Sequence, residues 1–95
     1  MKHKITIAYC PKCNWMMRAA WLAQELLVTF EEEIELMSLK PSPSSGSFII
    51  SVEDTIVFDR KTYGGFAEPK VIKQLIRDFI APDKNLGHSD HKRSE

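Results

Sequence analysis

Apolar residues alternate with other residues near the start of the chain, and the spacing then becomes helical. In residues 4–9, Ile5, Ile7 and Tyr9 point to one side, which is typical of a strand with one buried face. Residues 14–30 instead place their apolar side chains on one broad arc of a helix. The members of this arc are Trp15, Ala19, Leu22, Ala23, Leu26, Leu27 and Phe30.

The rest of the chain predicts three further strands and a second helix. Two of the strand-like runs are separated by only two residues, which is the length of a tight hairpin. The second helix opens on a proline and ends at an Ala-Pro pair. The predicted strands are residues 33–39, 48–52 and 55–59, the helix is residues 69–80, and the main loops are residues 41–47 and 61–66.

The order of these elements is β-α-β followed by β-β-α, in one domain expected to span residues 1–82. The first unit requires parallel strands with a right-handed crossover, and the hairpin adds antiparallel strands. We therefore predict an α/β fold: a two-layer β-α-β-β-β-α sandwich with a four-stranded mixed sheet and both helices on one face. This is the layout of a minimal thioredoxin-like domain. Residues 83–95 form a polar tail that we expect to be disordered.

Charge and hydropathy restrict the possible partners. The 13 basic and 13 acidic residues cancel, so nothing favours nucleic acid or a membrane surface. The apolar stretch after the basic N-terminus is too short for a signal peptide, and no apolar run approaches the roughly 18 residues of a membrane helix. We therefore expect a cytoplasmic protein that binds neither nucleic acid nor membrane.

The only two cysteines, Cys10 and Cys13, lie where the first strand gives way to the first helix. In a reducing cytosol such a pair is typical of catalysis or metal binding rather than of a permanent crosslink. A thiolate is the nucleophile in disulfide exchange, and a helix N-terminus stabilises the anion. We expect Cys10 just before the helix and Cys13 in its first turn, with Lys12 and Arg60 or Lys61 adding positive charge. The two sulfurs can then form an intramolecular disulfide.

Two other interpretations of the pair stay open. Cys-Pro-Lys-Cys also occurs in zinc knuckles, but structural zinc takes four ligands and the chain has no second cysteine pair. His88 and His91 have a suitable spacing, yet they lie far along the chain in the polar tail. The remaining interpretation is two unreactive core cysteines, since free cysteine is often buried. The residues favour the redox pair, with no metal bound.

Three loops are expected to meet at one edge of the sheet. If the third strand runs antiparallel beside the first, it begins where the first strand ends, and the fourth strand finishes at that edge as well. Loops gathered on a rigid scaffold are where sites tend to form. The supporting residues expected there are Pro11, Lys12, Ser45, Gly46, Gly64 and Gly65.

A second apolar stripe on the first helix consists of Met17, Trp21 and Val28. The simpler expectation is that it packs against the second helix, because both helices lie on one sheet face. The alternative is an exposed surface for a partner.

Several motifs resemble the selenoprotein W-related family, which is also called the SelT/SelW/SelH or Rdx family. The resemblance covers residues 4–80 and is closest to cysteine-containing members of bacterial type. It rests on IAYCPKC (7–13), WMMRAAW (15–21), QELL (24–27), SGSF (45–48) and GGF (64–66).

This resemblance implies a thioredoxin-like fold and a thiol-disulfide oxidoreductase or redox sensor that serves cell redox homeostasis. It implies glutathione or thiol-bearing proteins as partners, no bound cofactor, and a monomer or weak dimer. Animal relatives often carry selenocysteine at the position of Cys13, which implies Cys13 as the attacking residue, whereas in thioredoxin-like enzymes the first cysteine, here Cys10, usually attacks; the two alternatives stay open. The alternative functions are a non-catalytic, redox-regulated interaction module and, less favoured, a zinc-binding domain.

Overall fold

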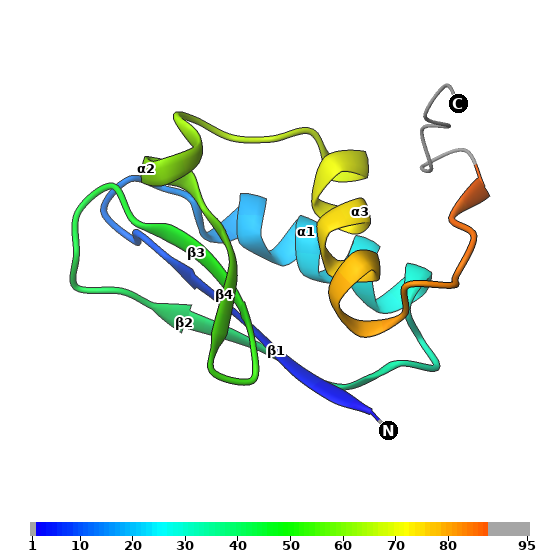
Figure 1. The fold of residues 1–95 in the computed structure, drawn as a ribbon. Helices are drawn as coiled ribbons and strands as arrows, with labels where there is room; N and C mark the ends of the chain where they lie inside the picture. Colours follow the sequence, from blue (N-terminus) through cyan, green and yellow to red (C-terminus); the bar gives the residue numbers. More distant parts are fainter. Residues whose placement is uncertain (1, 88–95) are drawn as a thin grey trace.

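The computed structural model describes residues 2–87, and its strands form one mixed sheet (Figure 1). The elements are β1 (His3–Tyr9), α1 (Met16–Thr29), β2 (Ile34–Pro41), β3 (Phe48–Val52), β4 (Thr55–Asp59), α2 (Arg60–Tyr63) and α3 (Pro69–Ile80). The strand order is β2-β1-β3-β4. β1 pairs in parallel with β2 and antiparallel with β3, and β4 is antiparallel to β3. The helix α1 is therefore the crossover of a β-α-β unit, as predicted.

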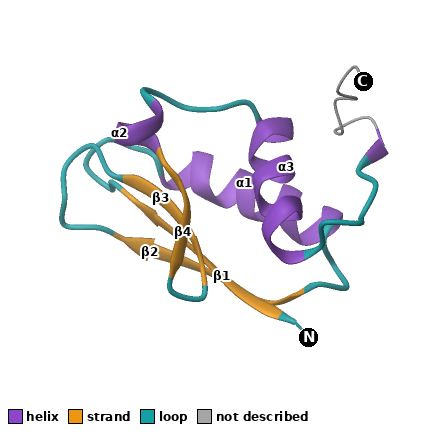
Figure 2. Ribbon diagram, viewed as in Figure 1, coloured by secondary structure: helices purple, strands orange, loops and turns teal. Residues whose placement is uncertain are grey.

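The core lies between the sheet and the helices α1 and α3, which cover the same face (Figure 2). On β1, Ile5 and Ile7 are fully buried, and the register places them beside Val52 and Ile50 of β3. The helices contribute Ala19, Leu22, Ala23 and Leu26 from α1 and Ile72 and Ile76 from α3. This architecture confirms the predicted α/β fold with both helices on one face, and it is consistent with a thioredoxin-like arrangement.

The loop predicted between the fourth strand and the last helix contains a short helix instead. Residues 61–66 were expected to be irregular, but Arg60–Tyr63 forms α2. Its N-cap, Asp59, accepts a hydrogen bond from the backbone N–H of Lys61 at 3.0 Å. Gly64 ends α2 in a left-handed conformation with φ of 95°, which a residue without a Cβ adopts at little cost. The chain then crosses to α3.

The second stripe of α1 faces solvent. Met17, Trp21 and Val28 are 79%, 49% and 76% exposed, so the expectation that they pack against the second helix is wrong. The stripe borders the contact between α1 and α3: Trp21 lines a small hollow with Pro69, and Lys73 Nζ of α3 lies 2.9 Å from Glu25 Oε1, one turn after Trp21 on α1. The apolar stripe is consequently available to a partner.

Residues 83–87 follow α3 and contact the rest of the domain. Arg77 donates a hydrogen bond to the carbonyl oxygen of Lys84 at 2.8 Å, and Lys84 Nζ lies 3.3 Å from Glu33 Oε2. Leu86 packs against the core. The remainder of the tail that was expected to be disordered, residues 88–95, lies outside the described residues.

Candidate redox site

A disulfide joins Cys10 and Cys13 across the turn between β1 and α1. The two Cα atoms are 5.3 Å apart. Within this turn the N–H of Cys13 donates to the carbonyl oxygen of Cys10 at 3.3 Å, and the N–H of Asn14 donates to that of Pro11 at 3.0 Å. The backbone thus bends back on itself and brings both sulfurs together. We call residues 10–14 the Cys loop.

The two cysteines differ in their access to solvent. Cys10 directly continues β1 and is 1% exposed, whereas Cys13 is only partly buried. An incoming thiolate must approach a sulfur along the S–S axis from outside. Cys13 is therefore the more exposed residue of the pair.

The helix begins later than the sequence pattern predicted. Asn14 has a left-handed conformation with φ of 64°, and α1 starts at Met16, after the N-cap Trp15. Asparagine tolerates this conformation better than most residues. The expectation that Cys13 occupies the first helical turn is therefore wrong. Because the electrostatic effect of a helix N-terminus falls off within about one turn, it stabilises a Cys13 thiolate less than a position inside the helix would allow.

The loop after β2 closes one side of the site. Because β1 and β2 are parallel, both end at the same edge, and the N–H of Ser42 donates to the carbonyl oxygen of Tyr9 at 2.8 Å. A hollow of about 480 Å³ lies between this loop and the Cys loop. Its lining residues are Cys10, Pro11, Lys12, Ser42, Pro43 and Ser45. The composition predicted a loop here but carried no signal that singles out Ser42.

The remaining supporting residues hold the neighbouring loops. Gly46 has a φ of 74°, and a Cβ added there would lie 3.7 Å from Lys61 Cε, so the stem of Lys61 runs beside this loop. Gly64 and Gly65 do not line the hollow. With φ values of 95° and 148° they turn the chain from α2 towards Phe66.

An aromatic cluster of Trp15, Phe48 and Phe66 lies directly behind the Cys loop. The ring of Trp15 is 6.4 Å from that of Phe48 and 4.8 Å from that of Phe66, and the two phenylalanines are 5.1 Å apart, all edge to face. The guanidinium of Arg60 lies 4.8 Å over the ring of Trp15, and that of Arg18 lies 3.9 Å over Phe66. Cations over aromatic faces are attracted by the ring quadrupole. Two arginines are thereby held near the disulfide.

The Nε atom of Arg60 is buried and has no hydrogen-bond partner among residues 2–87. The sequence pattern marked Arg60 only as a nearby charge and did not single out Arg18. The members of the aromatic cluster come from three separate segments of the chain. No periodic pattern in the sequence therefore indicated the cluster or the arginines that stack on it.

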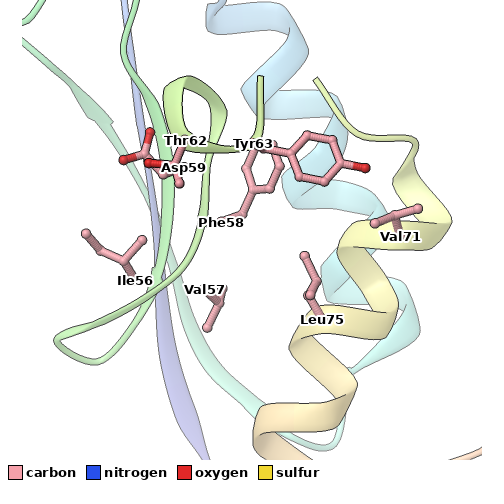
Figure 3. Close-up of a pocket in the computed structure, with 8 residues that line it drawn as sticks. All are labelled: Ile56, Val57, Phe58, Asp59, Thr62, Tyr63, Val71 and Leu75. Carbon is pink, nitrogen blue, oxygen red and sulfur yellow. The ribbon is translucent and has the colours of Figure 1, made fainter. Parts of the chain in front are cut away.

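A second hollow, of about 490 Å³, lies between β4, α2 and α3 (Figure 3). Apolar side chains such as Phe58, Tyr63 and Leu75 point into it, and the rings of Phe58 and Tyr63 are 5.3 Å apart. Its one carboxylate, Asp59, already caps α2. No residue of the Cys loop lines it, so the chemistry of the described chain is concentrated at the disulfide.

Within residues 2–87, no three side chains of His, Cys, Asp or Glu come together as a metal-binding group. His88 and His91, the other ligands considered for zinc, lie outside these residues. In the same part of the chain no helix is both long and apolar enough to cross a membrane.

A mixed four-stranded sheet with its helices on one face, and a Cys-x-x-Cys disulfide after the first strand, define a class of small redox-related α/β proteins. The Rdx family model matches residues 4–78. The chain belongs to the Rdx family, which confirms the resemblance seen in its motifs.

Solved structures agree with this assignment. The selenoprotein W-related protein from Vibrio cholerae is 51% identical, with a TM-score of 0.79 over 83% of this chain and 98% of that one. A protein from Bordetella parapertussis is 42% identical, with a TM-score of 0.80 over 84% of this chain and all of its own. A comparison with curated protein sequences found no match to the chain.

Proposed function

We propose that this protein is a cytoplasmic thiol-disulfide oxidoreductase or redox sensor that cycles between a Cys10–Cys13 disulfide and the dithiol. The observation that carries the proposal is the disulfide itself, closed across a tight turn between a buried Cys10 and a partly exposed Cys13. Strained or accessible disulfides are the exchangeable ones, whereas structural disulfides are shielded from attack.

From the difference in burial we propose different roles for the two cysteines. In the reduced protein, the thiolate of Cys13 attacks a partner disulfide, and one partner thiolate leaves and takes up a proton. The thiolate of Cys10 then attacks Cys13, breaks the mixed disulfide and releases the second partner thiolate. Two electrons pass from the dithiol to the partner, and the Cys10–Cys13 bond forms.

Positive charge around the Cys loop supports this chemistry. Lys12 lies between the cysteines, and the stacked guanidinium of Arg60 lies over Trp15, two residues after Cys13. Nearby cations favour a thiolate over a thiol, and the thiolate is the species that attacks. We propose glutathione or the thiols of other proteins as the exchange partners, with no bound cofactor.

A redox titration tests the proposal. The protein is equilibrated in glutathione buffers of graded potential, with and without a chelator, and its free thiols are counted by alkylation and mass spectrometry. We expect a reversible two-electron transition at the same potential in both series. Cys10→Ser should leave a Cys13 thiol that alkylates rapidly, and Cys13→Ser should leave a slowly reacting Cys10.

Two results would contradict it. Equal alkylation rates for the two single variants would contradict the roles proposed for Cys13 as the attacking and Cys10 as the resolving cysteine. Absence of a reversible transition would remove the redox function itself, and a transition that appears only with chelator would indicate zinc held by the thiols.

The second candidate function is a non-catalytic interaction module whose binding depends on redox state. The exposed stripe of Met17, Trp21 and Val28 favours it, because large apolar side chains gathered on a surface mark interaction sites. The two candidates differ in turnover: a module should show the transition of the disulfide but no acceleration of exchange between substrate thiols and disulfides.

A further inference from the structure

Four positively charged side chains lie in or beside the segments that meet at the Cys loop: Lys12, Arg18, Arg60 and Lys61, here called the cationic edge. Lys12 lines the hollow beside Cys10, Arg18 and Arg60 lie over rings of the aromatic cluster, and Lys61 runs beside the loop after β2. None of the four forms an ion pair within the described part of the chain. No ion pair among the described residues therefore neutralises their charge, although the whole chain has no net charge.

Much of the negative charge lies at the opposite end of the molecule. Since β2 runs parallel to β1 and β3 runs antiparallel to it, the connection from α1 to β2 and the turn from β3 to β4 lie away from the Cys loop. Asp59, which precedes Arg60 in the chain, is an acidic residue at the cationic edge, and it caps α2. The distant acidic residues are Glu31, Glu32, Glu33, Glu53 and Asp54. Such a separation attracts anionic partners towards the positive end.

An exposed apolar ridge adjoins the cationic edge. Its members are Pro11, Met16, Met17 and Trp21. Pro11, Met16 and Met17 line a hollow of about 470 Å³ on the other side of the Cys loop from the first, and Met17 is 79% exposed. Trp21 lies one turn farther along α1 and is half exposed. Methionine side chains adapt to varied apolar partners, so this ridge is suited to a flexible chain segment.

We propose that this surface binds a polypeptide segment whose reactive cysteine is flanked by acidic residues and by one large apolar residue. The inference rests on the proposed redox function and adds the class of its substrate. The acidic side chains face the cationic edge, and the apolar side chain enters the hollow between Pro11 and Met17. A small anionic thiol would use the charge but leave the ridge uncovered.

The exchange follows the steps given above, with the segment as the disulfide partner. The thiolate of Cys13 attacks the cysteine sulfur of the segment, and the sulfur bound to it leaves as a thiolate. The thiolate of Cys10 then attacks Cys13 and releases the segment as a second thiolate. The protein dithiol is the reductant, and both released thiolates take protons from solvent.

Disulfide-linked dimers of short blocked peptides test the proposal. Each peptide has one cysteine and one leucine, and the flanking residues are three glutamates, three lysines or three serines. Rates of reduction by the reduced protein are divided by rates with dithiothreitol, which corrects for the reactivity of each peptide. We expect the corrected rate for the acidic peptide to exceed that for the basic one about tenfold at low salt, and to approach it at about 0.5 M salt.

Matched variants locate the effect. Arg18→Gln and Lys61→Gln should lower the rate for the acidic peptide several-fold more than the rate for the serine peptide, whereas Lys4→Gln, at the other end of β1, should change neither. A fourth peptide, the acidic one with serine in place of its leucine, should be reduced more slowly than the acidic peptide, and Met17→Ser should abolish this difference. Val28→Ser is its control, because Val28 is equally exposed but lies about 16 Å farther along the helix.

Specific outcomes overturn the inference. Corrected rates that are equal within twofold for the three peptides would remove the charge preference while leaving the redox function intact. Equal rates for glutathione disulfide and the acidic peptide, together with no effect of Met17→Ser, would assign the surface to small anionic thiols. Reduction of none of these disulfides would overturn both the inference and the proposed function.

Discussion

Phe48 connects the sheet to the aromatic cluster behind the Cys loop, and its replacement by leucine measures how firmly that cluster is held. Phe48 starts β3, pairs with Tyr9 at the end of β1 and is 1% exposed. Its ring contacts those of Trp15 and Phe66. Leucine keeps an apolar side chain at this position but removes both ring contacts.

The magnitude follows from those contacts. An aromatic pair contributes about 0.5 to 1.5 kcal/mol beyond its buried area, so the loss of two pairs should cost about 1 to 3 kcal/mol. The change of shape in a packed core adds a further cost of up to about 1.5 kcal/mol. Phe30→Leu is the matched control, because Phe30 is fully buried but has no ring partner within residues 2–87. Phe30→Leu should therefore show only the cost of the changed side-chain shape.

The assay is urea unfolding of the oxidised proteins, followed by circular dichroism so that changes in tryptophan emission do not enter. We expect Phe48→Leu to lower the free energy of unfolding by about 1 to 3 kcal/mol more than Phe30→Leu, with unchanged denaturant slopes. If both substitutions lower the free energy of unfolding by the same amount, the ring contacts of Phe48 do not stabilise the protein, and the reasoning fails.

Two further predictions concern the turns at either end of the sheet. The hydrogen bond from the N–H of Lys4, followed by that from His3, holds the pKa of Glu53 below its ordinary value of 4.5. This carboxylate therefore stabilises the fold above that pH and stops doing so as the pH falls through its lowered folded-state pKa. The difference in stability between wild type and Glu53→Gln, measured from urea midpoints at and below pH 4.5, should shrink as the pH falls. A difference that does not change with pH would show that the hydrogen bonds to the Glu53 carboxylate do not cause it. Gly64→Ala should lower the free energy of unfolding by about 1 kcal/mol through its left-handed conformation alone, since an added Cβ meets no atom within 4 Å. Thermal unfolding checks this, and an unchanged midpoint would show that the α2 cap contributes nothing.

Elements that bury one face were predictable from the sequence. The strands β3 and β4 and the helix α3 have the predicted bounds, because a strand repeats every two residues and a helix every 3.6. The four-residue helix α2 was missed, since it is too short to show a period. The start of α1 was also misplaced, because hydrophobic spacing carries no information on the φ angle of a single residue such as Asn14.

The sequence by itself determined the order of the elements, the Cys-x-x-Cys motif at the end of the first strand and the family of the protein. Those features depend on local periodicity and on residue identity, which are fully present in the chain. Only the tertiary structure decided that Cys10 is buried while Cys13 is accessible, and that Arg18 and Arg60 stack on one aromatic cluster. Burial and stacking depend on contacts between segments far apart in the chain, and no local pattern encodes them.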